Sequence, residues 1–103
     1  MLDYLDFVKR WAPNENPHDF VGLSGYINAQ LIAAVLQRCG SDLTRENLLK
    51  QATTLKGVRM AMLLPGIDLS NSADDYAPYN QLRLARFDGA TWVLLEDAIA
   101  GVR

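Results

Sequence analysis

The sequence contains a single cysteine, Cys39, and a single histidine, His18, among its 103 residues. One thiol cannot close a disulfide within the chain, so no disulfide framework holds the fold together. These two side chains are also too few for the nitrogen and sulfur ligand sets of ordinary zinc sites, whereas a site built from carboxylates alone stays open. We therefore expect no resident metal and no cofactor.

The chain also lacks a concentration of positive charge. Ten Lys and Arg residues are scattered among twelve Asp and Glu residues, which gives a formal net charge of −2. A protein that binds nucleic acid through the phosphates needs a concentrated cationic face to displace their counterions. The charge distribution therefore excludes nucleic acid as the expected partner.

Long apolar runs are missing as well. The longest, "LIAAVL", amounts to one or two helical turns, so we expect no segment that spans a bilayer. The first residues, "MLDYLDFVKRW", have neither the positive start nor the continuous apolar stretch of a signal peptide, so the chain as written would not be exported. Half of the residues are nevertheless apolar, which is enough for the core of one globular domain.

Three helices are expected, at residues 2–11, 24–39 and 45–55. In the first, Leu2, Leu5, Val8 and Trp11 form a stripe, which the Pro- and Asn-rich loop "APNENPHDF" ends. The following helices carry the usual signals at their ends, with Ser24 and Thr44 as N-terminal caps and Gly40 and Gly57 as C-terminal glycines. Leu48, Leu49, Ala52 and Leu55 are expected to form the buried stripe of the third helix.

The helix expected at 24–39 is apolar around most of its circumference. Only Asn28, Gln30, Gln37 and Arg38 interrupt its apolar and small residues. A helix of this kind is normally covered on more than one side, and a chain of this length has few residues to cover it. We therefore expect the isolated chain to associate, to exchange elements or to remain bound to further parts of a larger fold.

The rest of the chain predicts extended structure. Residues 58–64 form a weak extended segment that ends at Pro65-Gly66, and "LLPGIDLSNSADDYAPYNQ" (63–81) follows as a connector. Strand-forming residues at 81–87 and 91–96 flank Asp88-Gly89, a pair typical of a β-hairpin turn. The tail "AIAGVR" is expected to fray.

No catalytic constellation emerges from the acidic and nucleophilic residues. Asp74 and Asp75 are adjacent, and neighbours in an extended segment point to opposite sides, so they cannot converge as a general acid and base. His18 has Asp19 beside it but no nucleophile within the loop. Cys39 is expected at a helix C-terminus, where the dipole disfavours a thiolate. The chain is therefore not expected to be an enzyme; a small hydrolase using Asp74, Asp75 and His18 is the weakest alternative.

The stretch "GLSGY" offers backbone N–H groups and a hydroxyl before a helix, a common arrangement that suits an anion or a carboxylate. Tyr26, Trp11 and Trp92 have rings that could stack on a ligand, although their spacing favours packing for most of them. From the residues alone, the chain is a mixed helix-and-strand protein without an assigned activity.

The order of its segments and the residues within them resemble the C-terminal part of the substrate-binding proteins of branched-chain amino-acid ABC transporters. The likeness runs over nearly all 103 residues, and it is specific as an ordered set rather than motif by motif. The segments that carry it are "FVKRWAPNENP", "SGYINAQLIAAVLQRCG", "DLTRENLLKQATTLKG", "LLPGIDLSNSADDYAPYNQ" and "LRLARFDGATWVLLED".

The resemblance implies the C-terminal portion of a type I periplasmic-binding-protein fold, an α/β architecture of two lobes with parallel sheets. Residues 1–103 would then be one segment of that protein, and 63–81 would cross between the lobes. The stretch "VGLS" would lie at the rim of the cleft, which makes Val21, Leu23 and Ser24 the candidate ligand-binding residues and leaves Tyr26 to packing.

The function implied is the binding of an amino acid or a small organic or aromatic acid by hinge closure, in the periplasm, for delivery to the transporter permease. This chain would be a fragment of such a protein or the product of a truncated reading frame. The alternative is a standalone α+β protein that self-associates through the apolar helix and the edge of the 81–96 hairpin.

Overall fold

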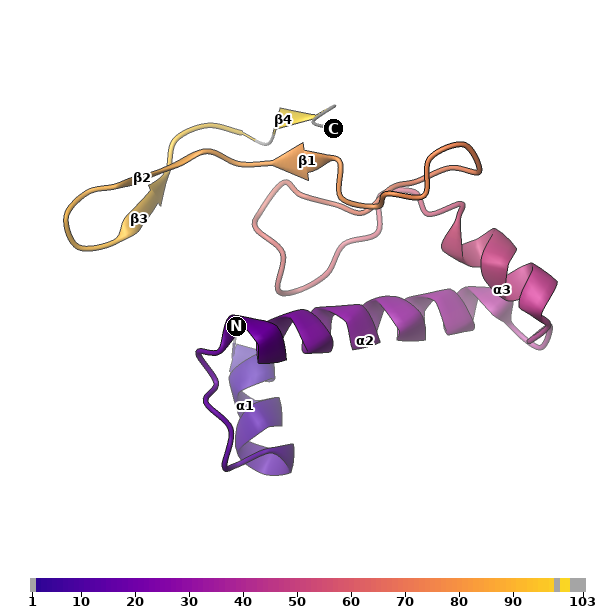
Figure 1. Ribbon diagram of the computed structural model, residues 1–103, viewed down its shortest axis with the longest axis horizontal. Coiled ribbons are helices and arrows are strands. Elements are labelled where there is room, and N and C mark those ends of the chain that lie inside the picture. Colours follow the sequence, from indigo (N-terminus) through magenta and orange to yellow (C-terminus); the bar gives the residue numbers. More distant parts are fainter. Residues whose placement is uncertain (1, 98, 101–103) are drawn as a thin grey trace. The chain divides into compact units, whose positions relative to one another are not determined.

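The computed structural model describes residues 2–97 and 99–100, and the chain divides into two compact units. The first unit comprises Met1–Leu48 with Met60–Met62, and the second comprises Leu49–Arg59 with Leu63–Arg103. Figure 1 shows helices α1 (Leu2–Trp11), α2 (Phe20–Cys39) and α3 (Arg45–Ala52), followed by four short strands. The described residues thus combine helices with small antiparallel strand pairs.

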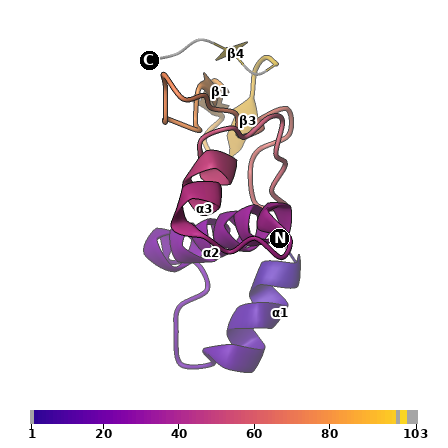
Figure 2. The same ribbon diagram turned by 90° about the vertical axis from the view of Figure 1, so that its right-hand side faces the viewer.

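Helix α1 spans the predicted residues, but its buried side is not the whole predicted stripe. Tyr4 and Val8 are buried, whereas Trp11 is mostly exposed. In the first unit, α1 runs across the direction of α2 rather than alongside it (Figures 1 and 2). Two crossed helices touch over a short length, so the residues at the crossing are buried and those at the far end, including Trp11, are not.

Helix α2 begins four residues before its predicted start. Asp19 is the N-terminal cap, and its carboxylate accepts a hydrogen bond from the N–H of Val21 at 2.9 Å. The prediction of Ser24 as the cap is therefore wrong, because the earlier Asp satisfies the free N–H groups and the helix continues through Gly22 and Gly25. At the other end, Gly40 has φ of 59° and confirms the predicted C-terminal glycine.

Although α2 is mostly apolar, few of its side chains are buried. Within Phe20–Cys39, which is described throughout, the buried residues are Val35 and Cys39. Large apolar side chains stand exposed along the rest of the helix, with Phe20 at 77% and Val21 at 76%. The expected cover of this helix is therefore not supplied by the residues around it.

Helix α2 also changes the expectation that no segment of the chain is long enough to span a bilayer. It is long enough and apolar enough to cross a bilayer by length and composition, with a mean hydropathy of 1.3, and it is the one such helix among the described residues. The prediction of no segment of that length is therefore wrong. Core helices of soluble proteins and signal sequences meet the same criterion, so this property alone is weak evidence for a membrane segment.

Helix α3 is shorter than predicted and its leucines are not buried. Thr44 caps it as predicted, since its hydroxyl oxygen accepts a hydrogen bond from the N–H of Asn47 at 3.3 Å. The helix ends at Ala52 rather than at 55, and Leu48 and Leu49 are exposed. Gly57, with φ of 58°, lies beyond the helix and donates its N–H to the Ser70 hydroxyl at 2.9 Å.

The core of the second unit is formed by the connector 63–81 together with the residues after α3. Leu55 and Leu69 are its buried apolar residues, at 2% and 0% exposure. Val58 and Leu69 exchange two backbone hydrogen bonds of 3.0 and 2.8 Å, so of the predicted extended segment 58–64 Val58 is the residue in a β-bridge. The connector is thus held by pairing to residues 55–58.

Four short strands follow as two antiparallel pairs. The predicted hairpin is confirmed next to its turn, as β2 (Ala85–Phe87) paired with β3 (Trp92–Leu94) with Phe87 opposite Trp92, but the predicted strand 81–87 is not continuous. β1 (Gln81–Leu82) pairs with β4 (Ile99–Ala100), so the prediction that the tail frays is wrong for these two residues. The remaining tail positions, 98 and 101–103, lie outside the described residues.

The stability of the hairpin turn is expected to depend on pH. The Asp88 carboxylate accepts hydrogen bonds from the N–H groups of Thr91 at 2.8 Å and Ala90 at 2.9 Å. The bond from Thr91, and next that from Ala90, lower the pKa of Asp88 below its ordinary value. A carboxyl with a lowered folded-state pKa stabilises the turn above its ordinary pKa, and this contribution is lost as the pH falls through the lowered value.

We therefore expect the amide resonances of Ala90 and Thr91 to move together during an acid titration by NMR, with a midpoint below about 4, the ordinary pKa of an aspartate. Asp88→Asn should abolish this titration while keeping an oxygen acceptor. A midpoint above the ordinary value would contradict the assignment of these two bonds.

Candidate functional site

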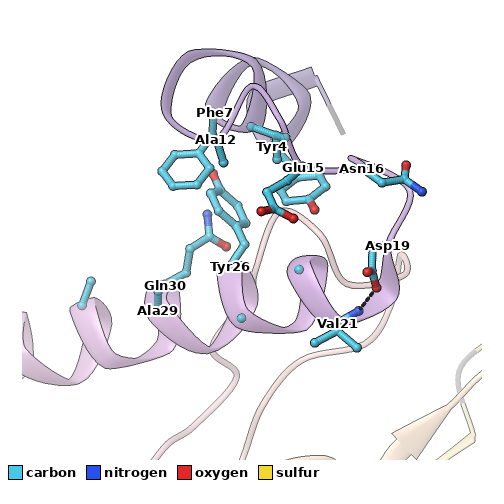
Figure 3. A pocket seen from close by; sticks show the side chains of 14 residues that line it. Tyr4, Phe7, Ala12, Glu15, Asn16, Asp19, Val21, Tyr26, Ala29 and Gln30 are labelled. Atoms are coloured by element: carbon cyan, nitrogen blue, oxygen red, sulfur yellow. Dashed lines mark hydrogen bonds between the residues drawn. The ribbon is translucent and has the colours of Figure 1, made fainter.

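The first unit has an open groove of about 640 Å³ between α1, the loop after it and α2 (Figure 3). Its walls are mainly apolar. Residues four apart on α1 and three or four apart on α2 face it, because those spacings place side chains on one side of a helix. They are Tyr4, Phe7 and Val8 on α1, Ala12 directly after it, and Gly22, Gly25, Tyr26, Ala29, Gln30 and Ala33 on α2.

Three aromatic rings form one part of the wall. The ring of Tyr26 lies 5.2 Å from that of Tyr4 and 5.1 Å from that of Phe7, measured between centroids, with interplanar angles of 59° and 54°. Tilted contacts at these distances are favourable for aromatic pairs. Tyr26 therefore does pack, as expected, but it packs against α1 at the edge of an open groove.

Small residues form the α2 side of the groove. A side chain at Gly25 would have open space, because a Cβ placed there meets nothing within 4 Å. A Cβ at Gly22 would instead lie 3.3 Å from the hydroxyl oxygen of Tyr4. The glycines of "VGLSGY" thus serve the shape of the groove and the close approach of α1, rather than a loop before the helix.

The charged residues among the described groove lining are both acidic. One carboxylate oxygen of Asp19 accepts a hydrogen bond from the N–H of Val21. Glu15 belongs to the loop after α1, and its side chain lies between Tyr4 and Tyr26 in the view of Figure 3. Gln30 points from α2 toward Phe7 and Tyr26, and its amide oxygen is buried without a hydrogen-bond partner among the described residues. A buried acceptor without a donor is costly unless a water or a ligand supplies one.

Only one of the three candidate ligand-binding residues lines the groove. Val21 lines the groove, whereas Leu23 and Ser24 are half-buried parts of α2 outside its lining. All three belong to the first two turns of the helix and not to a loop before it. The Leu23 N–H of "GLSGY" donates to the Asp19 carbonyl oxygen at 3.2 Å, within the helix.

Two of the groove's aromatic residues, Tyr4 and Phe7, were not predicted as site residues. Their spacing on α1 resembles that of any core-facing stripe. The more useful signal is the repeat of small residues at 22, 25, 29 and 33, which marks one side of α2 as open to a close neighbour. That signal is hard to recognise in the sequence, because these small residues stand among the apolar residues that surround most of the helix.

The remaining candidates lie apart from the groove. Asp74 is exposed, and Asp75 accepts a hydrogen bond from the N–H of Ala77 at 3.1 Å within a turn closed by Ser72 and Asp75. The His18 N–H donates to the Asn16 side-chain oxygen at 3.0 Å, which stabilises the loop before α2. Cys39 is a free, buried thiol.

No group of three His, Cys, Asp or Glu side chains suited to a metal ion occurs within the residues that the structure describes. The candidate site is therefore the groove itself, defined by three aromatic rings, small residues on α2 and two carboxylates. Comparisons with known proteins found no matching family model, no matching curated protein and no matching solved structure.

Proposed function

We propose that this chain is the C-terminal part of an extracytoplasmic solute-binding protein of the branched-chain amino-acid ABC importer type. The two lobes close around an amino acid or a small organic acid, and the loaded protein delivers it to the permease from the periplasm. In this proposal residues 63–81 cross between the lobes, and Val21, Leu23 and Ser24 stand near the ligand.

The observation that carries the proposal is the uncovered apolar surface of α2. Phe20, Ile32 and Leu36 are large apolar side chains on this helix, and all are exposed. Each Å² of apolar surface left in water costs roughly 25 cal/mol relative to burial, so this helix is stabilised when another element covers it. A second part of the same protein is the cover that the resemblance implies.

The connector 63–81 supports the proposal in a second way. It is an ordered segment, because Asn71 makes hydrogen bonds to Leu55 and Ala52, and Ser70 makes hydrogen bonds to Gly57 and Pro78. A segment that carries motion between lobes must be ordered apart from a few hinge positions, because slack in it would uncouple them.

The proposal is tested with Ile32→Glu in two proteins: the 103-residue chain, and the longer protein read in frame from the gene. Ile32 is exposed here, so the substitution should leave the unfolding midpoint of the short chain nearly unchanged, as surface substitutions do. In the longer protein it should lower stability by about 3 kcal/mol or more, because a charge would be buried without a partner. Asn28→Glu, at an exposed polar position of the same helix, is the matched control.

A ligand screen completes the test. Branched-chain amino acids and small aromatic acids should raise the melting temperature of the longer protein, as any ligand specific to the folded state does. A gene that encodes no further lobe, or a longer protein that tolerates Ile32→Glu, would contradict the proposal.

The same exposed surface favours a second candidate, a standalone protein that self-associates through α2 and the β2–β3 hairpin. In that case the 103-residue chain sediments as a stable dimer, and Ile32→Glu converts it to a monomer. Sedimentation of a well-folded wild-type monomer at micromolar concentration would remove this candidate.

A further inference from the structure

We propose that the groove between α1 and α2 binds a small organic cation, namely a protonated amine that carries an apolar group. This goes beyond the proposed function, because the groove lies within the first unit and its described lining needs no second lobe. It also differs in chemistry from the carboxylate ligand of that proposal.

The aromatic wall is the first argument. Tyr26 lies between two other rings, Tyr4 and Phe7, at centroid distances of 5.2 and 5.1 Å, and all three line the groove. Tyr4 is buried behind this contact, so Phe7 and Tyr26 are the rings with surface open to a ligand. The face of an aromatic ring attracts a cation within about 6 Å of its centroid, which suits alkylated ammonium groups. The apolar bodies of these rings also accept the hydrocarbon part of the same ligand.

Charge and hydrogen bonding are the second argument. Glu15 and Asp19 are the charged side chains in the described lining, and neither is balanced there by a Lys or Arg. The amide oxygen of Gln30, buried and without a donor among the described residues, adds a third acceptor. Asn16, Gln30 and the tyrosine hydroxyls can donate, but a carboxylate ligand would still face two negative charges, whereas an ammonium group offers the missing donors and the opposite charge.

Lys9 is a cationic side chain that shares a hollow with Glu15 and could compete with a cationic ligand for its charge. It lines a smaller hollow of about 300 Å³ together with Glu15, Leu5, Val8 and Pro17. Because Lys9 belongs to that hollow and not to the groove, it weakens the field of Glu15 without occupying the space beside the rings. Its removal should therefore strengthen cation binding.

The size of the groove is the third argument. A volume of about 640 Å³ lies within the range of small-molecule sites, roughly 300–1,000 Å³. The space exists because glycine and alanine stand on α2 where larger side chains would fill it, and Gly25 in particular faces open space. A phenyl ring with a short amine chain occupies only part of this volume.

The test measures binding of three probes that share a 2-phenylethyl group to the 103-residue chain at neutral pH: 2-phenylethylamine, 2-phenylethanol and 3-phenylpropanoate. We expect the protonated amine to bind about tenfold more tightly than the neutral alcohol, and the carboxylate to bind more weakly than the alcohol. The amides of Gly25, Tyr26 and Ala29 should shift in NMR spectra on titration with the amine.

Variants separate the contributions. Gly25→Leu should abolish binding by filling the groove while favouring the helix, and Asn28→Leu, outside the lining on the same helix, is its matched control. Glu15→Gln should bring the affinities of the amine and the alcohol together, and Lys9→Gln should raise the affinity for the amine. Where Gly25→Leu disturbs the far-UV circular dichroism, Ala29→Met tests the same space.

Equal affinity for the amine and the alcohol, or a preference for the carboxylate, would overturn the proposal and leave an apolar site without charge selection. Binding that survives both groove-filling variants, or no binding of the amine at millimolar concentration, would overturn it as well. The Ile32 experiment decides the proposed function separately, since Ile32 is not among the residues that line the groove.

Discussion

Leu69→Ala is expected to remove most of the stability of the second unit, with a loss of about 3 kcal/mol in the free energy of unfolding. Leu69 is fully buried, and its backbone pairs with that of Val58; Leu55 is the other buried apolar residue among the described residues of this unit. Truncation removes the transfer energy of three carbons and leaves a cavity. A loss of this size is a large share of the stability of a domain of this length.

The measurement is native-state hydrogen exchange at the amides of Val58 and Leu69, which bond to each other's carbonyl oxygens. A loss of 3 kcal/mol corresponds to exchange roughly 100-fold faster, because each tenfold change is about 1.4 kcal/mol. Leu95→Ala is the control, since Leu95 is half exposed in the same unit and should change exchange by less than about threefold. Equal effects of both variants would mean that Leu69 is not the centre of this core.

Asn71→Ala is expected to cost about 2–3 kcal/mol, through hydrogen bonds rather than through a cavity. The Asn71 side-chain oxygen accepts from the N–H of Leu55 at 2.8 Å, and its amide nitrogen donates to the Ala52 carbonyl at 2.8 Å. The Asn71 N–H also donates to the Leu55 carbonyl at 3.0 Å. The side chain thus satisfies backbone groups around a buried residue after α3 ends, and alanine leaves them without partners.

Two further variants make this prediction specific. Asn71→Asp keeps the acceptor for Leu55 but loses the donor to Ala52 and places a negative charge beside a carbonyl oxygen, so its cost should be similar and should shrink in acid. Asn80→Ala removes a single bond of 3.4 Å to the Ser70 carbonyl and should cost less than about 1 kcal/mol. Chemical denaturation followed by Trp92 fluorescence in a Trp11→Phe background measures the second unit. A cost at Asn80 equal to that at Asn71 would contradict the bridging role.

Features set by neighbouring residues could be predicted from the sequence. The bounds of α1 follow from an apolar period that a Pro- and Asn-rich loop ends, and they are confirmed. The end of α2 at Gly40, the Thr44 cap and the turn at Asp88-Gly89 are likewise confirmed, because each depends on backbone geometry within a few residues. The start of α2 was predicted wrongly, since both Asp19 and Ser24 can cap a helix and only the hydrogen bond from Val21 distinguishes them.

Features that join distant residues were decided by the tertiary structure. No pattern along the chain indicates that Leu82 lies opposite Ile99, or that the side chain of Asn71 reaches Leu55. Leu48 and Leu55 are equally apolar, yet the first is exposed and the second buried, because the fold after α3 turns back to cover only the second.

The candidate site divides in the same way. The sequence by itself determined that α2 is apolar on nearly every side and carries glycine or alanine at 22, 25, 29 and 33, because composition and period are local properties. Only the tertiary structure decided that α1 brings Tyr4 and Phe7 against Tyr26, and that Glu15 and Asp19 are the charges beside those rings. The groove exists because two helices cross, and a crossing is a relation between distant residues that no local period encodes.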